Sequence, residues 1–163
     1  MKIKSTSLLG LSVIAISTLF FASSCKKSNS GASGQLSATV NGTSFQPSLA
    51  TAIDEQGHIL VAGIQVISGD TVGMTLSVPD TAKAGSVISL GLNYDDIMTF
   101  SHSKTQIAYD TYETYAHGTI NVSTLDKTNK KVAGSFTATL YNFTGSADSV
   151  KVTGQFNTTY LTY

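Results

Sequence analysis

Three histidines are the first side chains in this sequence that could do chemistry, because imidazole binds transition metals and transfers protons near neutral pH. They are His58, His102 and His117. None has a second His or a Cys at the short spacing of a metal-binding motif, so a metal site would need a convergence that the sequence does not predict. We therefore expect no metal site and no cofactor.

Nucleophilic catalysis by serine needs a Ser activated by a His that an acidic group orients. Ser and Thr make up about a quarter of the chain, so such combinations arise from composition alone. The chain lacks the G-x-S-x-G motif, which places the nucleophile on a sharp turn between a strand and a helix. We therefore assign no catalytic residue.

Two pairs of adjacent acidic residues, Asp54-Glu55 and Asp95-Asp96, could supply oxygen ligands for calcium. Neither pair belongs to a spaced loop motif such as D-x-D-x-D-G. We favour the simpler interpretation that they are solvated turn residues, and a calcium-dependent activity stays an alternative.

Tyrosines supply the candidate ligand surface. Tyr94, Tyr109, Tyr112 and Tyr115 lie in one short stretch of the chain, where their rings could stack on sugars or on a partner protein. In the alternative that we favour, the rings pack over the edge of a β-sandwich and only the hydroxyls reach water.

Three Asp-[Ser/Thr]-apolar triplets resemble the O-glycosylation acceptor sequence of exported Bacteroidetes proteins. The acceptor residues would be Thr71, Thr81 and Ser149. Each lies at a turn signal beside an expected strand, where a bulky glycan would not disturb core packing. Chance also produces such triplets, and that alternative stays open.

The first 24 residues have the pattern of a lipoprotein signal peptide. Lys2 and Lys4 precede an apolar run, Leu8 to Phe21, that is shorter than the ~20 residues of a membrane-spanning helix. The run leads into Ala22-Ser23-Ser24-Cys25, which resembles the lipobox of bacterial lipoproteins, in which the cysteine becomes the acylated N-terminus. We predict lipidation of Cys25, including palmitate-type acyl chains, and stable attachment to a membrane; ordinary secretion with a free thiol is the alternative.

Residues 25–34 are predicted to be a lipidated flexible tether, because KKSNSGASG after the cysteine contains no side chain large enough for a core. Lys26 and Lys27, with no acidic residue before Asp54, favour the periplasmic face of the outer membrane over the cell surface. Ten Lys balance ten acidic residues over the whole chain, which argues against a nucleic-acid partner.

From residue 35 to 163 the apolar pattern has period two, which is typical of strands with one buried face. Turn signals at short spacing leave no room for crossover helices. The pattern predicts an all-β fold of at least six antiparallel strands, an antiparallel β-sandwich or partly open barrel. One segment alternates Leu60, Ala62, Ile64 and Val66. The residues expected to be buried are Ile64, Leu76, Ile120, Val122, Phe136, Leu140, Val152 and Phe156.

The clearest local prediction is a C-terminal hairpin in which 132–141 pairs with 152–161, because both segments contain V-x-G-x-F. With a turn centred on Ser146, Phe136 would lie opposite Phe156. Gly134 and Gly154 would permit bending, or an aromatic ring lying over the backbone.

A resemblance rests on the same region. The succession GTINV at 118–122, Asp126, VAGSFTA at 132–138 and VTGQF at 152–156 is similar to an uncharacterised family of Bacteroidetes lipoproteins, a domain of unknown function. The resemblance implies an all-β domain in the cell envelope and transfers no catalytic residue.

Two hypotheses for the function remain. The preferred one is a non-enzymatic cell-envelope lipoprotein whose β-domain binds an envelope protein or a glycan, or serves as a structural module. The alternative is a small envelope hydrolase or a calcium-dependent glycan-processing factor.

Overall fold

The chain folds into strands, as the period-two pattern predicts. The computed structural model describes residues 34–91, 97–111, 116–144 and 148–162. The strands are β1 (Gln35–Val40), β2 (Thr43–Phe45), β3 (Leu49–Glu55), β4 (His58–Ile67), β5 (Asp70–Pro79), β6 (Val87–Leu90), β7 (Met98–His102), β8 (Ile107–Asp110), β9 (His117–Asp126), β10 (Lys131–Asn142) and β11 (Ser149–Thr162). The all-β prediction is confirmed. Among the described residues no helix is long and apolar enough to cross a membrane.

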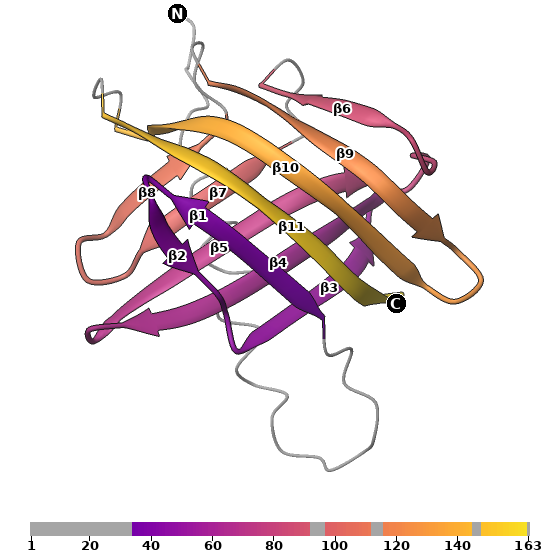
Figure 1. The fold of residues 1–163 in the computed structure, drawn as a ribbon, viewed down its shortest axis with the longest axis horizontal. Coiled ribbons are helices and arrows are strands. Elements are labelled where there is room, and N and C mark those ends of the chain that lie inside the picture. The colour runs from indigo at the N-terminus through magenta and orange to yellow at the C-terminus, as the bar shows by residue number, and fades with distance from the viewer. Residues whose placement is uncertain (1–33, 92–96, 112–115, 145–147, 163) are drawn as a thin grey trace, which may run out of the picture. The chain divides into compact units, whose positions relative to one another are not determined.

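The strands form two packed layers (Figure 1). The first layer has the order β2-β1-β11-β10-β9-β6, and the second has the order β3-β4-β5-β7-β8. The layers join at two corners, where β11 pairs with β3 and β10 pairs with β8. A sandwich of this kind buries the inner face of each layer against the other.

One pairing differs from the expected antiparallel arrangement, because the end of β11 runs parallel to β3. β11 is longer than its neighbour β1, whose first residue, Gln35, lies opposite Asn157. The remaining edge of β11, Tyr160–Thr162, is therefore open to another strand, and β3 occupies it. The sheet is mixed for this reason.

Tight turns set the register of the N-terminal hairpins. Asn41-Gly42, Gln56-Gly57 and Ser68-Gly69 connect successive strands, and all six residues have positive φ. Two consecutive positive φ values define the type I′ turn, whose twist matches that of the flanking strands. These turns are the short connections between strands that the sequence predicts.

Seven of the eight residues predicted to be buried are in the core, with exposed fractions of 2% or less. The exception is Ile64, which is half-buried on the outer face of β4. The phase predicted for this strand was wrong, because Ile59 and Val61 are the fully buried residues. β4 is apolar on both faces, so alternation alone could not tell which face lies inside.

The C-terminal hairpin forms, but its predicted register was wrong by two residues. Phe136 lies opposite Gly154, and Phe156 lies opposite Gly134. The two rings still share the inner face and stack, with centroids 6.4 Å apart and an interplanar angle of 23°. Each ring therefore covers a strand glycine, as the alternative reading of these glycines predicted.

Candidate ligand-binding face

The outer face of the first layer carries a continuous row of hydroxyl groups. Thr39, Thr153, Thr137 and Thr119 are successive cross-strand partners on β1, β11, β10 and β9. The row continues to Ser44 on β2 and Ser89 on β6. All six side chains are exposed except Thr119, which is half-buried. Because paired strands lie about 4.8 Å apart, the row forms a regular ladder of hydrogen-bonding groups.

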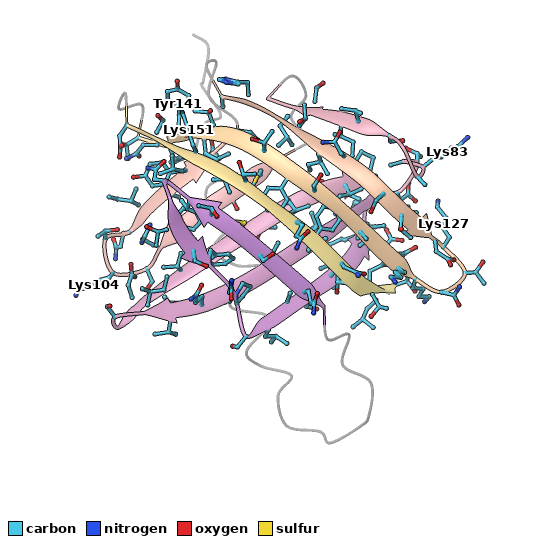
Figure 2. All side chains as sticks on the ribbon, in the orientation of Figure 1. Lys83, Lys104, Lys127, Tyr141 and Lys151 are labelled. Carbon is cyan, nitrogen blue, oxygen red and sulfur yellow. The ribbon has the colours of Figure 1, made fainter. Side chains whose placement is uncertain are left out.

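A second row runs beside the first, two residues further along the strands. It contains Ser37, Gln155, Ser135 and Asn121, again successive cross-strand partners. Every side chain named in the two rows is an uncharged hydrogen-bonding group, and the second row ends on β6 at the exposed apolar Val87, the partner of Asn121. We call the two rows the polar face. At one end of it lie Lys151, opposite Thr139, and Tyr141, opposite Ser149; both are labelled in Figure 2.

A hollow of about 240 Å³ lies in the polar face. Its floor includes Ala133 and Gly134, where the pairing of β10 with β9 shifts register at a bulge. Its rim consists of amides and hydroxyls: Gln35, Ser37, Ser123, Gln155 and Asn157. This volume is below the ~300 Å³ of the smallest drug-sized pockets, so the hollow suits one small polar unit of a larger ligand.

A larger hollow, about 510 Å³, lies between the β5–β6 connection and the β9–β10 turn. Lys83 and Lys127 project at this end of the domain (Figure 2). Its charged groups are largely occupied by local contacts. Lys127 Nζ lies 3.6 Å from Asp80 Oδ2, and Asp126 accepts hydrogen bonds from the backbone and side chain of Asn129. These bonds lower the pKa of Asp126. The hollow is therefore a poor candidate for acid or base chemistry.

An acid–imidazole pair joins two turns of the second layer. His102 Nδ1 lies 2.8 Å from Asp70 Oδ2. Asp70 Oδ1 accepts hydrogen bonds from the Lys104 backbone and from the Ser103 hydroxyl, at 2.8 and 3.2 Å. The Lys104 N–H bond and the His102 contact lower the pKa of Asp70. Ser103 donates to the carboxylate and not to the imidazole, so these three side chains lack the hydrogen-bond order of a catalytic triad.

The other candidate ligands for metal do not come together. His58 begins β4 and lies opposite Glu55, beside the turn between β3 and β4. His117 lies on the first layer, opposite Thr139. Among the residues that the structure describes, no three His, Cys, Asp or Glu side chains form a group that could hold a metal ion. Asp95 and Asp96 lie outside those residues.

Tyr109 is the one residue of the candidate tyrosine surface that the structure describes; Tyr94, Tyr112 and Tyr115 lie outside it. Its side chain is 8% exposed and belongs to the core. The hydroxyl donates a 2.7 Å hydrogen bond to Asp148 Oδ2. Burial, together with this carboxylate, raises the pKa of Tyr109 to about 12. The ring is a structural element and offers no exposed stacking surface.

Tyr109 should make the fold sensitive to alkali. Between pH 10 and 12 the unfolded chain loses the Tyr109 proton while the folded chain keeps it, so stability falls as pH rises. Between pH 10 and 12 the free energy of unfolding should fall by about 2–3 kcal/mol because of Tyr109. Urea denaturation of the wild type and of Tyr109→Phe from pH 9 to 12 measures it. The variant should show a smaller decline, and equal declines would contradict the prediction.

The three predicted acceptor residues for glycan occupy different parts of the domain. Thr71 is half-buried near the start of β5, opposite Val66. Thr81 is exposed and lines the larger hollow. Ser149 begins β11 opposite Tyr141 and is half-buried. The aspartates that precede Thr71 and Ser149 are both engaged, with His102 and Tyr109 respectively. Cys25 lies outside the described residues.

Comparisons with protein-family models, with curated proteins and with solved structures found no match to this chain. The polar face therefore stands on its own geometry. Sequence reasoning missed it, although its signal is present: in β10 and β11 the positions between the buried residues are mostly Ser, Thr, Gln and Asn, with Tyr141 and Lys151 among the exceptions. The fold prediction rests only on the apolar residues of that alternating pattern.

Proposed function

We propose that this chain is a non-enzymatic cell-envelope lipoprotein whose β-sandwich binds a neutral glycan through the polar face. The observation that carries the proposal is the uncharged ladder of hydroxyls and amides with a small hollow beside it. Sugars present hydroxyl and N-acetyl groups, which such side chains match as donors and acceptors. A charged partner would be bound better by charged side chains, which the two rows of the polar face lack.

The cellular side of the proposal rests on the N-terminal sequence. Acylation of Cys25 after removal of residues 1–24 would hold the domain at the membrane. The proposed site is the outer membrane, with the periplasmic face favoured because Lys26 and Lys27 follow the cysteine. The proposed source is an organism of the Bacteroidetes, in line with the resemblance of the C-terminal region.

Glycan binding should depend on the amide groups at the rim of the hollow. We expect the double variant Gln155→Ala, Asn157→Ala to weaken binding of cello- or chitin-oligosaccharides roughly thirty-fold, because each of the two lost hydrogen bonds contributes about 1 kcal/mol. Isothermal titration with both oligosaccharide series measures the effect. Gln46→Ala is the matched control, since Gln46 is an exposed amide in the connection between β2 and β3. Wild-type protein that binds neither series would refute the proposed ligand class.

Membrane attachment should depend on Cys25. The mature N-terminus is expected to be Cys25 with two or three acyl chains, because the lipobox-like sequence ends there. Cys25→Ala should move the protein from the membrane to the soluble fraction or block its processing. Mass spectrometry of the N-terminus and fractionation of cells measure both outcomes. An unmodified soluble form that begins elsewhere would contradict the prediction.

The alternative proposal is a small envelope hydrolase or a calcium-dependent glycan-processing factor. Its specific support is the Asp70–His102 pair, in which the carboxylate could orient the imidazole. Turnover of the same oligosaccharides by the wild type, abolished in His102→Ala, would favour this alternative over simple binding.

A further inference from the structure

The outer face of the second layer is apolar where β3 and β4 pair. Leu49 lies opposite Ile64, and Val66 follows Ile64 on the same side of β4. Leu49 is 64% exposed and Val66 is 69% exposed. Large apolar side chains that gather on an exposed surface usually mark a contact with a membrane or another protein.

The apolar surface continues along the same two strands. Ile53 lies opposite Leu60, and Leu161 at the end of β11 is the parallel partner of Ile53. Leu161 is 46% exposed. We call this surface the apolar face, and its members are Leu49, Ile53, Leu60, Ala62, Ile64, Val66 and Leu161. Ile53 is only 9% exposed, and the uncharged Thr51 lies between Leu49 and Ile53 on β3.

The start of the described chain lies beside the apolar face. Gly34 donates a backbone hydrogen bond to the oxygen of Ala50, the residue after Leu49. Cys25 precedes Gly34 by nine residues, which reach about 30 Å when fully extended. An acylated Cys25 would therefore hold the bilayer within about 30 Å of Gly34, a distance that includes Leu49.

Charged groups border the apolar face at both ends. At the Val66 end, Asp70 lies opposite Ile67 and binds His102 and the Lys104 backbone N–H. Asp54 and Glu55 end β3, far along the strand from Leu49, and they border Leu60 and Leu161. At the Leu49 end, the cross-strand neighbours of Ile64 and Val66 on β5 are Gly73 and Thr71, which are uncharged. Leu49, Ile64 and Val66 thus form an uncharged stretch that can contact lipid while the charged groups stay at its two ends.

We propose that the apolar face lies against the lipid bilayer, with Leu49, Ile64 and Val66 in contact with the acyl chains. This proposal rests on the anchoring at Cys25 that is part of the proposed function. It orients the sandwich, because the polar face belongs to the opposite layer. The polar face then points away from the membrane and stays accessible to a glycan.

The orientation can be read with a single introduced fluorophore, because the chain contains no Trp. Val66→Trp and Val87→Trp are made in the full-length lipidated protein, which is reconstituted in vesicles of phosphatidylethanolamine and phosphatidylglycerol. Val87 is the matched control, since it is 63% exposed and lies on β6 of the first layer. Brominated acyl chains should quench V66W at least twice as strongly as V87W. Thermal unfolding midpoints equal to that of the wild type show that both variants fold.

Equal quenching of the two variants would overturn the proposal. So would a dimer by sedimentation in which V66W is blue-shifted but not quenched, because the apolar face would then contact a second copy. A glycan on Thr71, opposite Val66, would also overturn it, since it would hold the face away from lipid.

The mass of the N-terminal peptide shows separately whether Cys25 is acylated. If Cys25 is unacylated, bromolipid quenching of V66W in the soluble chain still tests whether the apolar face contacts lipid. Titration with oligosaccharides tests glycan binding separately.

Discussion

Phe136→Ala is expected to lower the free energy of unfolding by about 3–5 kcal/mol, the usual cost of removing a large buried aromatic side chain. Phe136 is 2% exposed and stacks against Phe156 in the core of the sandwich. The substitution leaves a cavity over Gly154, which has no side chain that could fill it. Urea denaturation monitored by circular dichroism measures the loss.

Phe143→Ala is the matched control, because Phe143 follows the same strand but is 59% exposed. Its unfolding free energy should stay within about 0.5 kcal/mol of the wild type. An equal loss of unfolding free energy in the two variants would contradict the prediction. It would mean that Phe136 and Phe143 are equally buried in solution.

The inner faces of the long strands could be predicted because they alternate cleanly. In β5, Met74, Leu76 and Val78 are all buried, with the polar residues Thr75 and Ser77 between them in the sequence. β4 gives no such signal, since Ile59 and Leu60 are both large and apolar. A strand that contacted lipid on one side, as proposed, and the core on the other would need no polar half.

The hairpin register could not be predicted from the matched V-x-G-x-F patterns. Aligning like with like places Phe136 opposite Phe156, whereas the fold places each ring opposite a glycine. Two aromatic rings directly opposite each other need more room than a ring beside a bare backbone. A shift of two residues keeps every side chain on the same face, so alternation cannot distinguish the two registers.

The candidate site was less predictable than the fold. Charged, aromatic and histidine residues drew attention, yet Tyr109 is a core residue and His58 and His117 lie apart from the Asp70–His102 pair. The polar face is built from residue types that are frequent throughout the chain. Its significance comes from cross-strand registry, as in the pairing of Thr137 with Thr153 at 3.3 Å between hydroxyls. Registry depends on long-range pairing, which a single sequence does not reveal.

Gly154→Ala should destabilise the fold by about 2–3 kcal/mol, because overpacked core sites must shift their neighbours. A Cβ at this position would lie 2.5 Å from the Phe136 ring and 2.9 Å from the Ala38 Cα, and it would also collide with the Ser37 backbone oxygen. Gly73→Ala is the matched control. Gly73 is also within a strand, but its Cβ would meet only the Ser101 hydroxyl at 3.3 Å, so its stability should be unchanged or slightly higher.

A double-mutant cycle separates the ring from the backbone in this clash. Phe136→Leu shortens the side chain over residue 154 and should recover part of the loss in the Gly154→Ala background. The recovery should be incomplete, because the Ser37 oxygen and the Ala38 Cα belong to β1 and do not move with the ring. Additive effects of the two substitutions would show that the ring does not lie over Gly154, and the stacked Phe136–Phe156 arrangement would then be wrong.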